Sequence, residues 1–127
     1  MAAPNIVNVS TIEGKTSYLI PANTTFNVWT ALTPTPTGNV VHRVDFITAS
    51  NVTSAAATVT LSVNSGTSGT GTAYRIAFQI SVPAYSTLVL VDKTTALYID
   101  QTQSIVVTVG TASALEFVAS YEAITAP

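Results

Sequence analysis

His42 is the only histidine of this 127-residue chain, so it is the first candidate for a catalytic base. A hydrolytic triad needs such a base, a carboxylate that orients it and a serine or threonine nucleophile nearby. On the strand expected at residues 40–49, His42 shares one face with Val44 and Phe46, and the opposite face carries Arg43 and Asp45. The nearest carboxylate, Asp45, therefore points away from His42 and towards Arg43, with which it can pair.

No Gly-x-Ser-x-Gly motif marks a nucleophile anywhere in the chain. We therefore expect His42 to be a half-buried, hydrogen-bonded residue, and we predict that the protein is not an enzyme.

The six acidic residues form no pattern typical of glycoside hydrolysis or metal binding. Glycosidases need two carboxylates in one cleft, but Glu116 and Glu122 lie well apart on one expected strand, and Asp92 and Asp100 begin turns. Calcium sites need several oxygen ligands at close spacing, and thiolate chemistry is excluded because the chain has no cysteine. The glycine-rich residues 64–71 lack the lysine and helix that follow a phosphate-binding loop. The sequence predicts no catalytic residue, no metal ligand and no cofactor.

Three aromatic residues are candidates for stacking on a sugar ring, namely Trp29, Tyr85 and Tyr98. A carbohydrate-binding module would present such rings together on an exposed surface. Trp29, the only tryptophan, lies in a strand expected at residues 25–32 and is interpreted as a core or core-edge ring. A carbohydrate-binding β-sandwich is therefore the alternative of a different class.

Residues 74–82 alternate between apolar and polar side chains. Because side chains alternate across a strand, the segment predicts a strand with one buried and one solvated face. Further strands are expected at residues 16–20, 25–32, 40–49, 57–63, 88–91, 96–99, 105–109 and 115–121. Turn residues separate them roughly every ten positions, which predicts an all-β fold, a single-domain antiparallel β-sandwich of jelly-roll-like form.

The expected domain comprises residues 13–127, preceded by an N-terminal arm or edge strand at residues 1–12. Residues 13–15 predict a turn, and residues 33–39, with alternating prolines, predict a stiff surface crossover. Residues 64–71 predict a mobile hairpin tip, because glycine and small polar residues cannot pack. The expected core between the two sheets has eight members: Val59, Leu61, Ile76, Phe78, Ile80, Ile105, Val107 and Phe117.

The surface carries few charges: 8% of residues are charged and the net charge is −2. The four basic residues form no run, so no nucleic-acid partner is expected. No apolar run approaches the ~20 residues of a membrane-spanning helix, and residues 1–4 have no signal-peptide pattern, so no membrane is expected either. A neutral surface is cheap to desolvate. Four apolar residues are expected to point away from the core, namely Val89, Val91, Val106 and Val118. They predict a second buried surface, which suits contact with other subunits.

The second half of the chain resembles small virion structural proteins of tailed bacteriophages, especially those infecting cyanobacteria. The segments that carry the resemblance are Thr72-Ala73-Tyr74-Arg75-Ile76, Ile80-Ser81-Val82-Pro83-Ala84-Tyr85-Ser86-Thr87-Leu88-Val89-Leu90-Val91, Leu97-Tyr98-Ile99, Ser104-Ile105-Val106-Val107-Thr108-Val109 and Phe117-Val118-Ala119-Ser120-Tyr121-Glu122. The turn Asp100-Gln101-Thr102-Gln103 departs from the acidic turn of that family.

The resemblance implies a non-enzymatic virion component, most simply a capsid decoration (cement) protein that stabilises the head from the capsid surface. A tail, neck or fibre module is the alternative. The implied partners are further copies in a homo-oligomer, with a trimer favoured, and the major capsid protein or other virion proteins. The arm at residues 2–12 would add a strand to the edge of a neighbour's sheet.

Overall fold

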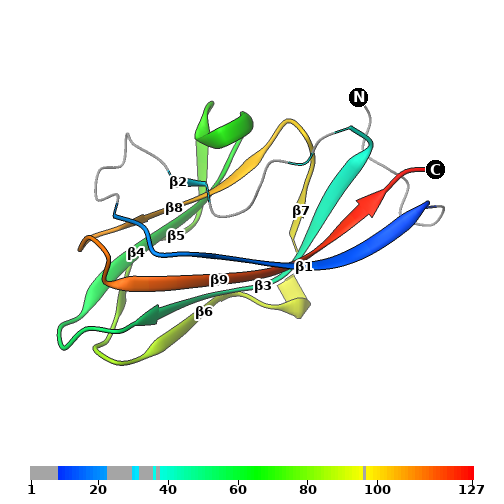
Figure 1. Ribbon diagram of the computed structural model, residues 1–127. Helices are drawn as coiled ribbons and strands as arrows, with labels where there is room; N and C mark the ends of the chain where they lie inside the picture. Colours follow the sequence, from blue (N-terminus) through cyan, green and yellow to red (C-terminus); the bar gives the residue numbers. More distant parts are fainter. Residues whose placement is uncertain (1–8, 23–29, 32–35, 37, 96) are drawn as a thin grey trace.

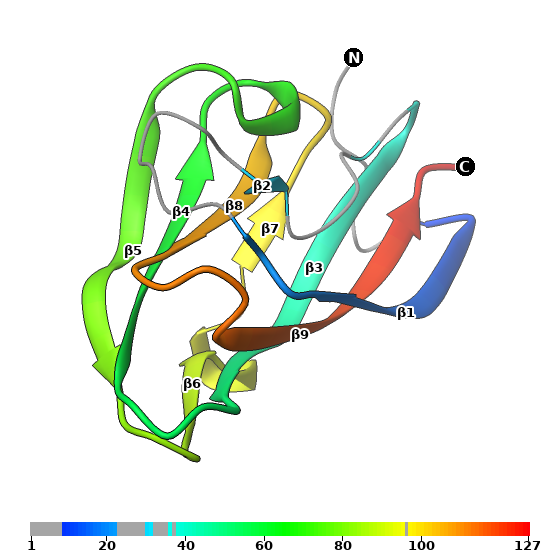
Figure 2. The same cartoon turned by 60° about the vertical axis from the view of Figure 1, so that its left-hand side comes forward.

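The computed structural model describes residues 9–22, 30–31, 36, 38–95 and 97–127. They form two antiparallel sheets packed face to face (Figure 1, Figure 2). Sheet A contains, in order, β1 (Thr11–Leu19), β9 (Leu115–Thr125), β3 (Val40–Asn51) and β6 (Thr87–Val91), and β7 (Leu97–Ile99) also pairs with β3. Sheet B contains β2 (Thr30–Ala31), β8 (Ser104–Val109), β4 (Ala57–Asn64) and β5 (Ala73–Val82). The predicted all-β sandwich is confirmed.

The strands pair as one folded ribbon. β1 pairs with β9, β2 with β8, β3 with β6 and β7, and β4 with β5. Wrapping such a ribbon on itself distributes its strands over two sheets, which is the jelly-roll arrangement. Two further pairings hold the wrapped ribbon together: β3 pairs with β9 in sheet A, and β4 pairs with β8 in sheet B. A short 3-10 turn, η2 (Lys93–Thr95), separates β6 from β7.

The predicted turns at Asp92 and Asp100 are confirmed, with the expected capping chemistry. The Asp92 carboxylate accepts hydrogen bonds from the backbone N–H groups of Thr94 and Thr95, at 3.0 and 3.2 Å. The Thr94 hydroxyl, which donates to the same carboxylate, and then these backbone bonds lower the pKa of Asp92, because they stabilise its charged form. The Asp100 carboxylate accepts the backbone N–H of Thr102 at 2.8 Å. Both carboxylates therefore hold turns.

The core lies between the two sheets and contains most of the residues predicted for it. Five of those residues are at most 1% exposed: Val59, Leu61, Ile105, Val107 and Phe117. The prediction is wrong for Ile76, Phe78 and Ile80, which are 43%, 50% and 43% exposed. The strand that looked most regular in the sequence is thus mostly exposed, with only Val82 buried.

Two features of β5 explain this error. β5 ends sheet B, so β4 covers it on one side only. The β4–β5 register also shifts twice, between Val59 and Leu61 and between Leu61 and Ser62, and Gln79 has a φ of 49°. Each bulge re-aims the side chains that follow it. The apolar residues of β5 alternate regularly in the sequence, but the bulges prevent them from forming one buried face.

The connection between β4 and β5, predicted to be mobile, is anchored to the sheet. It contains the 3-10 turn η1 (Thr67–Gly69). The Asn64 side chain is 0% exposed, and its Nδ2 donates to the Gly69 carbonyl at 2.9 Å. The Gly69 N–H donates to the Ser104 hydroxyl at 2.9 Å, and that hydroxyl donates to the Gly66 carbonyl at 2.8 Å. The prediction failed because small polar side chains that cannot pack can still hydrogen-bond the backbone.

We expect Asn64→Ala to lower the free energy of unfolding by about 1–3 kcal/mol, because it leaves the buried Gly69 carbonyl without its amide donor. Urea denaturation measures the loss. The control is Thr67→Ala at an exposed position in the same connection, where we expect a change within about 0.5 kcal/mol. Equal, small effects of the two substitutions would mean that the connection does not contribute to stability.

Residues 13–15, predicted to be a turn, instead lie inside β1. This strand pairs with β9 in unbroken register from Thr11 opposite Thr125 to Leu19 opposite Phe117. Just before it, the Ser10 N–H donates to the Thr125 carbonyl at 2.8 Å. Residues 9–12 therefore belong to, or directly precede, an edge strand. Trp29, residues 1–8 of the expected arm, and most of the expected strand 25–32 and crossover 33–39 lie outside the described residues.

Candidate interaction surface

The side of sheet A that points away from sheet B is called face A below. Along β9, alternate residues join the core, namely Leu115, Phe117, Ala119 and Tyr121. Because side chains alternate across a strand, the residues between them belong to face A: Glu116, Val118, Ser120 and Glu122. The cross-strand register then identifies their neighbours on β1, β3 and β6.

One row of side chains crosses four strands of sheet A on face A. Tyr18 of β1 lies opposite Val118 of β9, Val118 lies opposite Thr48 of β3, and Thr48 lies opposite Val89 of β6. Tyr18 and Val89 are 81% and 56% exposed, and the two residues between them are half-buried. The row is a continuous, uncharged strip across the sheet.

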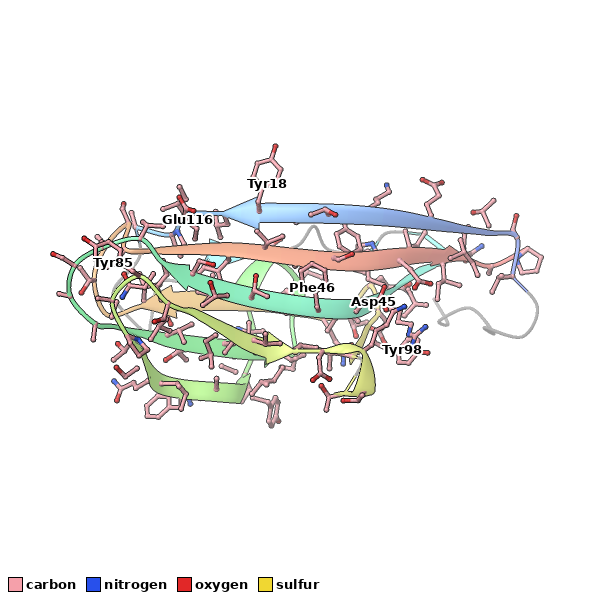
Figure 3. The ribbon with its side chains drawn as sticks, turned by 90° about the horizontal axis from the view of Figure 1, so that it is seen from below. Tyr18, Asp45, Phe46, Tyr85, Tyr98 and Glu116 are labelled. Atoms are coloured by element: carbon pink, nitrogen blue, oxygen red, sulfur yellow. The ribbon has the colours of Figure 1, made fainter. Side chains whose placement is uncertain are left out.

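Phe46 enlarges this strip from the next row, where it lies opposite Ser120 and is 38% exposed. The sequence placed Phe46 on the face of His42 and Val44, which is wrong. The β3–β9 register shifts between Val44 and Phe46, so the residue inserted there, Asp45, moves Phe46 to the opposite face. In Figure 3, Phe46 lies over the middle of the sheet and Tyr18 projects from its β1 edge.

Val89 and Val91 show the same effect on β6. Both were predicted to point outward, but Val91 is 4% exposed and belongs to the core. The β3–β6 register shifts between Ile47, opposite Val91, and Thr48, opposite Val89, so the two valines face opposite sides. Of the other two predicted outward valines, Val118 is half-buried on face A, and Val106 is 0% exposed. The predicted second apolar surface therefore consists of Val89 and Val118 with Tyr18 and Phe46, without Val91 and Val106.

Three charged groups, Arg43, Asp45 and Glu122, lie together at one end of sheet A. Arg43 Nε lies 3.8 Å from Asp45 Oδ1, which confirms the pairing predicted for these two residues, and Arg43 Nη1 lies 3.9 Å from Glu122 Oε1. Tyr98 of β7 lies opposite Arg43 and is 45% exposed. Both contacts are too long for hydrogen bonds, and Arg43 Nε and Asp45 Oδ1 are buried with no hydrogen-bond partner among the described residues, so neither contact is strong evidence of stabilisation. One arginine thus lies near two carboxylates, which leaves one net negative charge at this end of the face.

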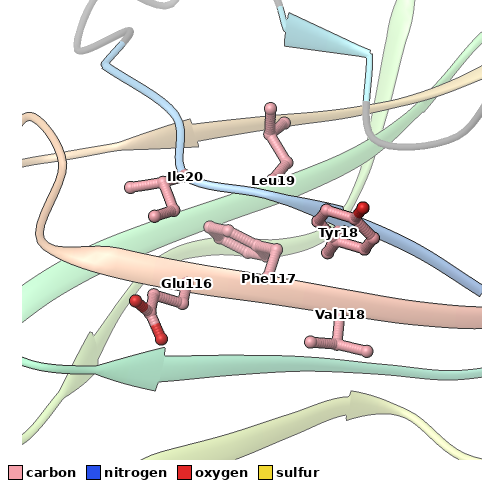
Figure 4. Close-up of a pocket in the computed structure, with 6 residues that line it drawn as sticks. All are labelled: Tyr18, Leu19, Ile20, Glu116, Phe117 and Val118. Atoms are coloured by element: carbon pink, nitrogen blue, oxygen red, sulfur yellow. The ribbon is translucent and has the colours of Figure 1, made fainter.

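A groove of about 520 Å³ opens where β1 ends beside β9 (Figure 4). The described residues that line it are Tyr18, Leu19, Ile20, Glu116, Phe117 and Val118. Most of these side chains are apolar, and Glu116 supplies one carboxylate at the rim. This largely apolar lining suits binding of an apolar or ring-shaped group.

His42 is packed away from any such groove. It is 6% exposed, and its ring centroid lies 4.6 Å from that of Tyr121. Burial, and to a lesser degree the charge of Lys15, lowers its pKa from 6.5 to about 4, so the ring is neutral at pH 7. Nδ1 has no hydrogen-bond partner among the described residues. His42 was predicted to be half-buried and hydrogen-bonded. It is instead buried, and its Nδ1 makes no hydrogen bond to a described residue.

The structure does not bring the predicted sugar-stacking residues together. Tyr85 is 74% exposed in the turn between β5 and β6, where its φ is 56°. Tyr98 lies at the other end of the sheet in Figure 3. Trp29 lies outside the described residues. Among the described residues, the most exposed ring of face A is Tyr18. Nothing in the sequence singled it out, because the alternation over residues 16–20 is too short to distinguish the two faces of a strand.

No protein-family model, curated protein or solved structure matches this chain. In the part of the chain that the structure describes, no group of three or more His, Asp or Glu side chains is placed to hold a metal ion. No helix within that part is long and apolar enough to cross a membrane.

Proposed function

We propose that the protein is a non-enzymatic structural component of a phage virion, a capsid decoration protein that stabilises the head. Face A is the contact surface for the major capsid protein or another virion protein. The observation that supports this proposal is the uncharged strip of Tyr18, Val118, Thr48, Val89 and Phe46 on an open sheet. Covering this strip removes apolar side chains from water without desolvating an ion.

The size of face A argues for binding in many copies. Four strands spaced ~4.8 Å apart span about 14 Å, and the eight residues from Glu116 to Ala123 span about 27 Å, so the sheet alone offers roughly 400 Å². A specific interface buries about 800 Å² on each partner. A single copy therefore binds weakly, and linked copies on a repeating lattice bind with a higher apparent affinity. The three-fold symmetry implied by the resemblance stays a prediction of that resemblance alone, and the two-fold pairing proposed below is its alternative.

A carbohydrate-binding sandwich is the second candidate, and the groove beside Tyr18 favours it. An exposed aromatic ring and the Glu116 carboxylate lie there together, as a sugar ring with its hydroxyl groups requires. A tail or fibre module would use either surface. Binding of soluble oligosaccharides, abolished by Tyr18→Ala, would favour the carbohydrate role over the decoration role.

We expect Val89→Lys to weaken binding to capsids that lack the protein by at least about tenfold, which corresponds to ~1.4 kcal/mol. The substitution places a charge within the uncharged strip, where it must lose its water when the partner covers the strip. Co-sedimentation of purified protein with such capsids measures the affinity.

The matched control is Ile76→Lys, which places the same charge at a 43% exposed apolar position on sheet B. Its affinity should stay within about twofold of the original protein, well below the tenfold threshold. If Ile76→Lys abolished binding while Val89→Lys did not, the contact would lie on β5 and face A would not be the site.

A further inference from the structure

The outer edge of β1 is regular and open. β1 pairs with β9 on one side over its whole length without a register shift, and no described strand lies on its other side. An edge strand of this kind presents a row of N–H and C=O groups that can pair with another strand. Its side chains at the edge are mostly exposed.

The two long edge strands differ in a way that matters for pairing. β5, which ends sheet B, has two register shifts and a residue with positive φ, and such irregularities prevent a further strand from adding. β1 contains no proline and no bulge. Of these two edges, only β1 keeps the geometry that another strand needs.

Hydrogen bonds next to β1 identify which of its backbone groups point outward. The Ala126 N–H donates to Asn39 O at 2.9 Å, and the Thr125 carbonyl accepts from Ser10 N at 2.8 Å. Even-numbered residues of β9 therefore direct their backbone groups to β3, and odd-numbered residues direct theirs to β1. In an antiparallel ladder this leaves alternate residues of β1 with groups directed to the open edge, namely Ile12, Gly14, Thr16 and Tyr18.

The charges of β1 select one register and one partner. Glu13 and Lys15 flank Gly14, their charged atoms are 3.9 Å apart, and their side chains are 63% and 50% exposed. If a second β1 lies antiparallel and the two-fold axis passes through Gly14, each Glu13 stands directly opposite the Lys15 of the other copy. A two-fold axis at Glu13 or at Lys15 would instead oppose like charges, which destabilises a sheet.

The same axis agrees with the backbone. It pairs Gly14 with Gly14 and Ile12 with Thr16, all residues whose N–H and C=O groups point to the open edge. The oppositely charged residues then fall in the non-hydrogen-bonded pairs, where side chains approach most closely. An added Cβ at Gly14 would meet no atom within 4 Å, so the centre of the edge is unobstructed.

We propose that two copies of the protein associate through β1, antiparallel about a two-fold axis at Gly14, so that their A sheets form one continuous sheet. Because that axis is perpendicular to the sheet, both copies present face A on the same side. The joined face is about twice the roughly 400 Å² of one copy, near the 800 Å² that a specific interface needs. The pairing itself does not depend on the virion role.

The test is the mass in solution, measured by light scattering and sedimentation equilibrium on the full chain. We expect a dimer of the 13.2 kDa chain. Glu13→Lys and Lys15→Glu should each weaken dimerisation by about tenfold or more, because each creates two like-charge contacts across the axis. The double variant restores opposite charges and should return to within about threefold of the original constant, less than 1 kcal/mol away.

Gly14→Pro provides a second test that leaves the monomer folded, since the Gly14 N–H points to the open edge and proline is tolerated there. It should abolish the dimer without changing the circular dichroism spectrum. A monomer at high concentration, a trimer, or a double variant as weak as the single ones would overturn the proposal. Loss of capsid binding by Val89→Lys with an intact dimer would leave the pairing untouched, so the two proposals fail separately.

Discussion

The Phe117→Ala variant is expected to lose about 3–5 kcal/mol of its free energy of unfolding. Phe117 is 1% exposed and lies between Leu19 of β1 and Ala49 of β3 in the register of sheet A. Removing its ring leaves a cavity that the surrounding strands fill only in part. Urea denaturation, with the slope of the transition unchanged, measures the loss.

Phe78→Ala is the matched control for this prediction. Its ring is 50% exposed, and its contact with the Arg75 guanidinium, 5.1 Å from the ring centroid, is of a kind that contributes about 0.5–1 kcal/mol at a surface. We therefore expect a loss of roughly 1 kcal/mol, several times smaller than for Phe117→Ala. Equal losses would show that β5 is as buried as β9.

Acidification is expected to remove about 3 kcal/mol of stability between about pH 6.5 and about pH 4, through His42 alone. Burial, and then Lys15, lower the pKa of His42 from 6.5 to about 4 in the folded protein. The unfolded chain has the ordinary pKa and therefore binds the proton first as the pH falls. The free energy of unfolding is therefore unaffected by His42 protonation above pH 6.5. It decreases as the pH falls to about 4, and His42 changes it no further below that value.

His42→Gln isolates this contribution, because glutamine does not titrate. Its free energy of unfolding, measured by urea denaturation at each pH, should change much less between pH 6.5 and pH 5, where the carboxylates remain ionised. The slope with pH is the readout, so a constant loss of stability caused by the substitution does not affect the conclusion. Parallel curves for the two proteins would mean that His42 is protonated equally in the folded and unfolded states.

The architecture was predictable because it depends on features that extend over many residues. Alternating segments separated by turns define a sandwich irrespective of any single position, and the strong patterns at residues 57–63 and 105–109 supplied core residues such as Leu61 and Val107. The turns at Asp92 and Asp100 were predictable because their hydrogen bonds are local.

The composition of face A was not predictable from parity, because one inserted residue reverses every side chain beyond it. Such insertions determine the outward direction of Phe46, the inward direction of Val91 and the exposure of Phe78. Their positions depend on the partner strand, which lies elsewhere in the sequence. A similar cause placed Glu13-Gly14-Lys15 in a strand, where pairing with β9 overrides a local preference for a turn.

The ribbon order of the strands determines when the contact surface first exists during synthesis. β4 and β5 are close in sequence and can pair early, but Thr11 of β1 pairs with Thr125, more than a hundred residues later. At about 5–20 residues per second, a ribosome needs on the order of 5–20 s to make the chain between them. Distant pairings also form slowly after synthesis. Face A joins β1, β9 and β3, so a nascent or half-folded chain does not display it, and a particle that binds this face selects copies whose folding is finished.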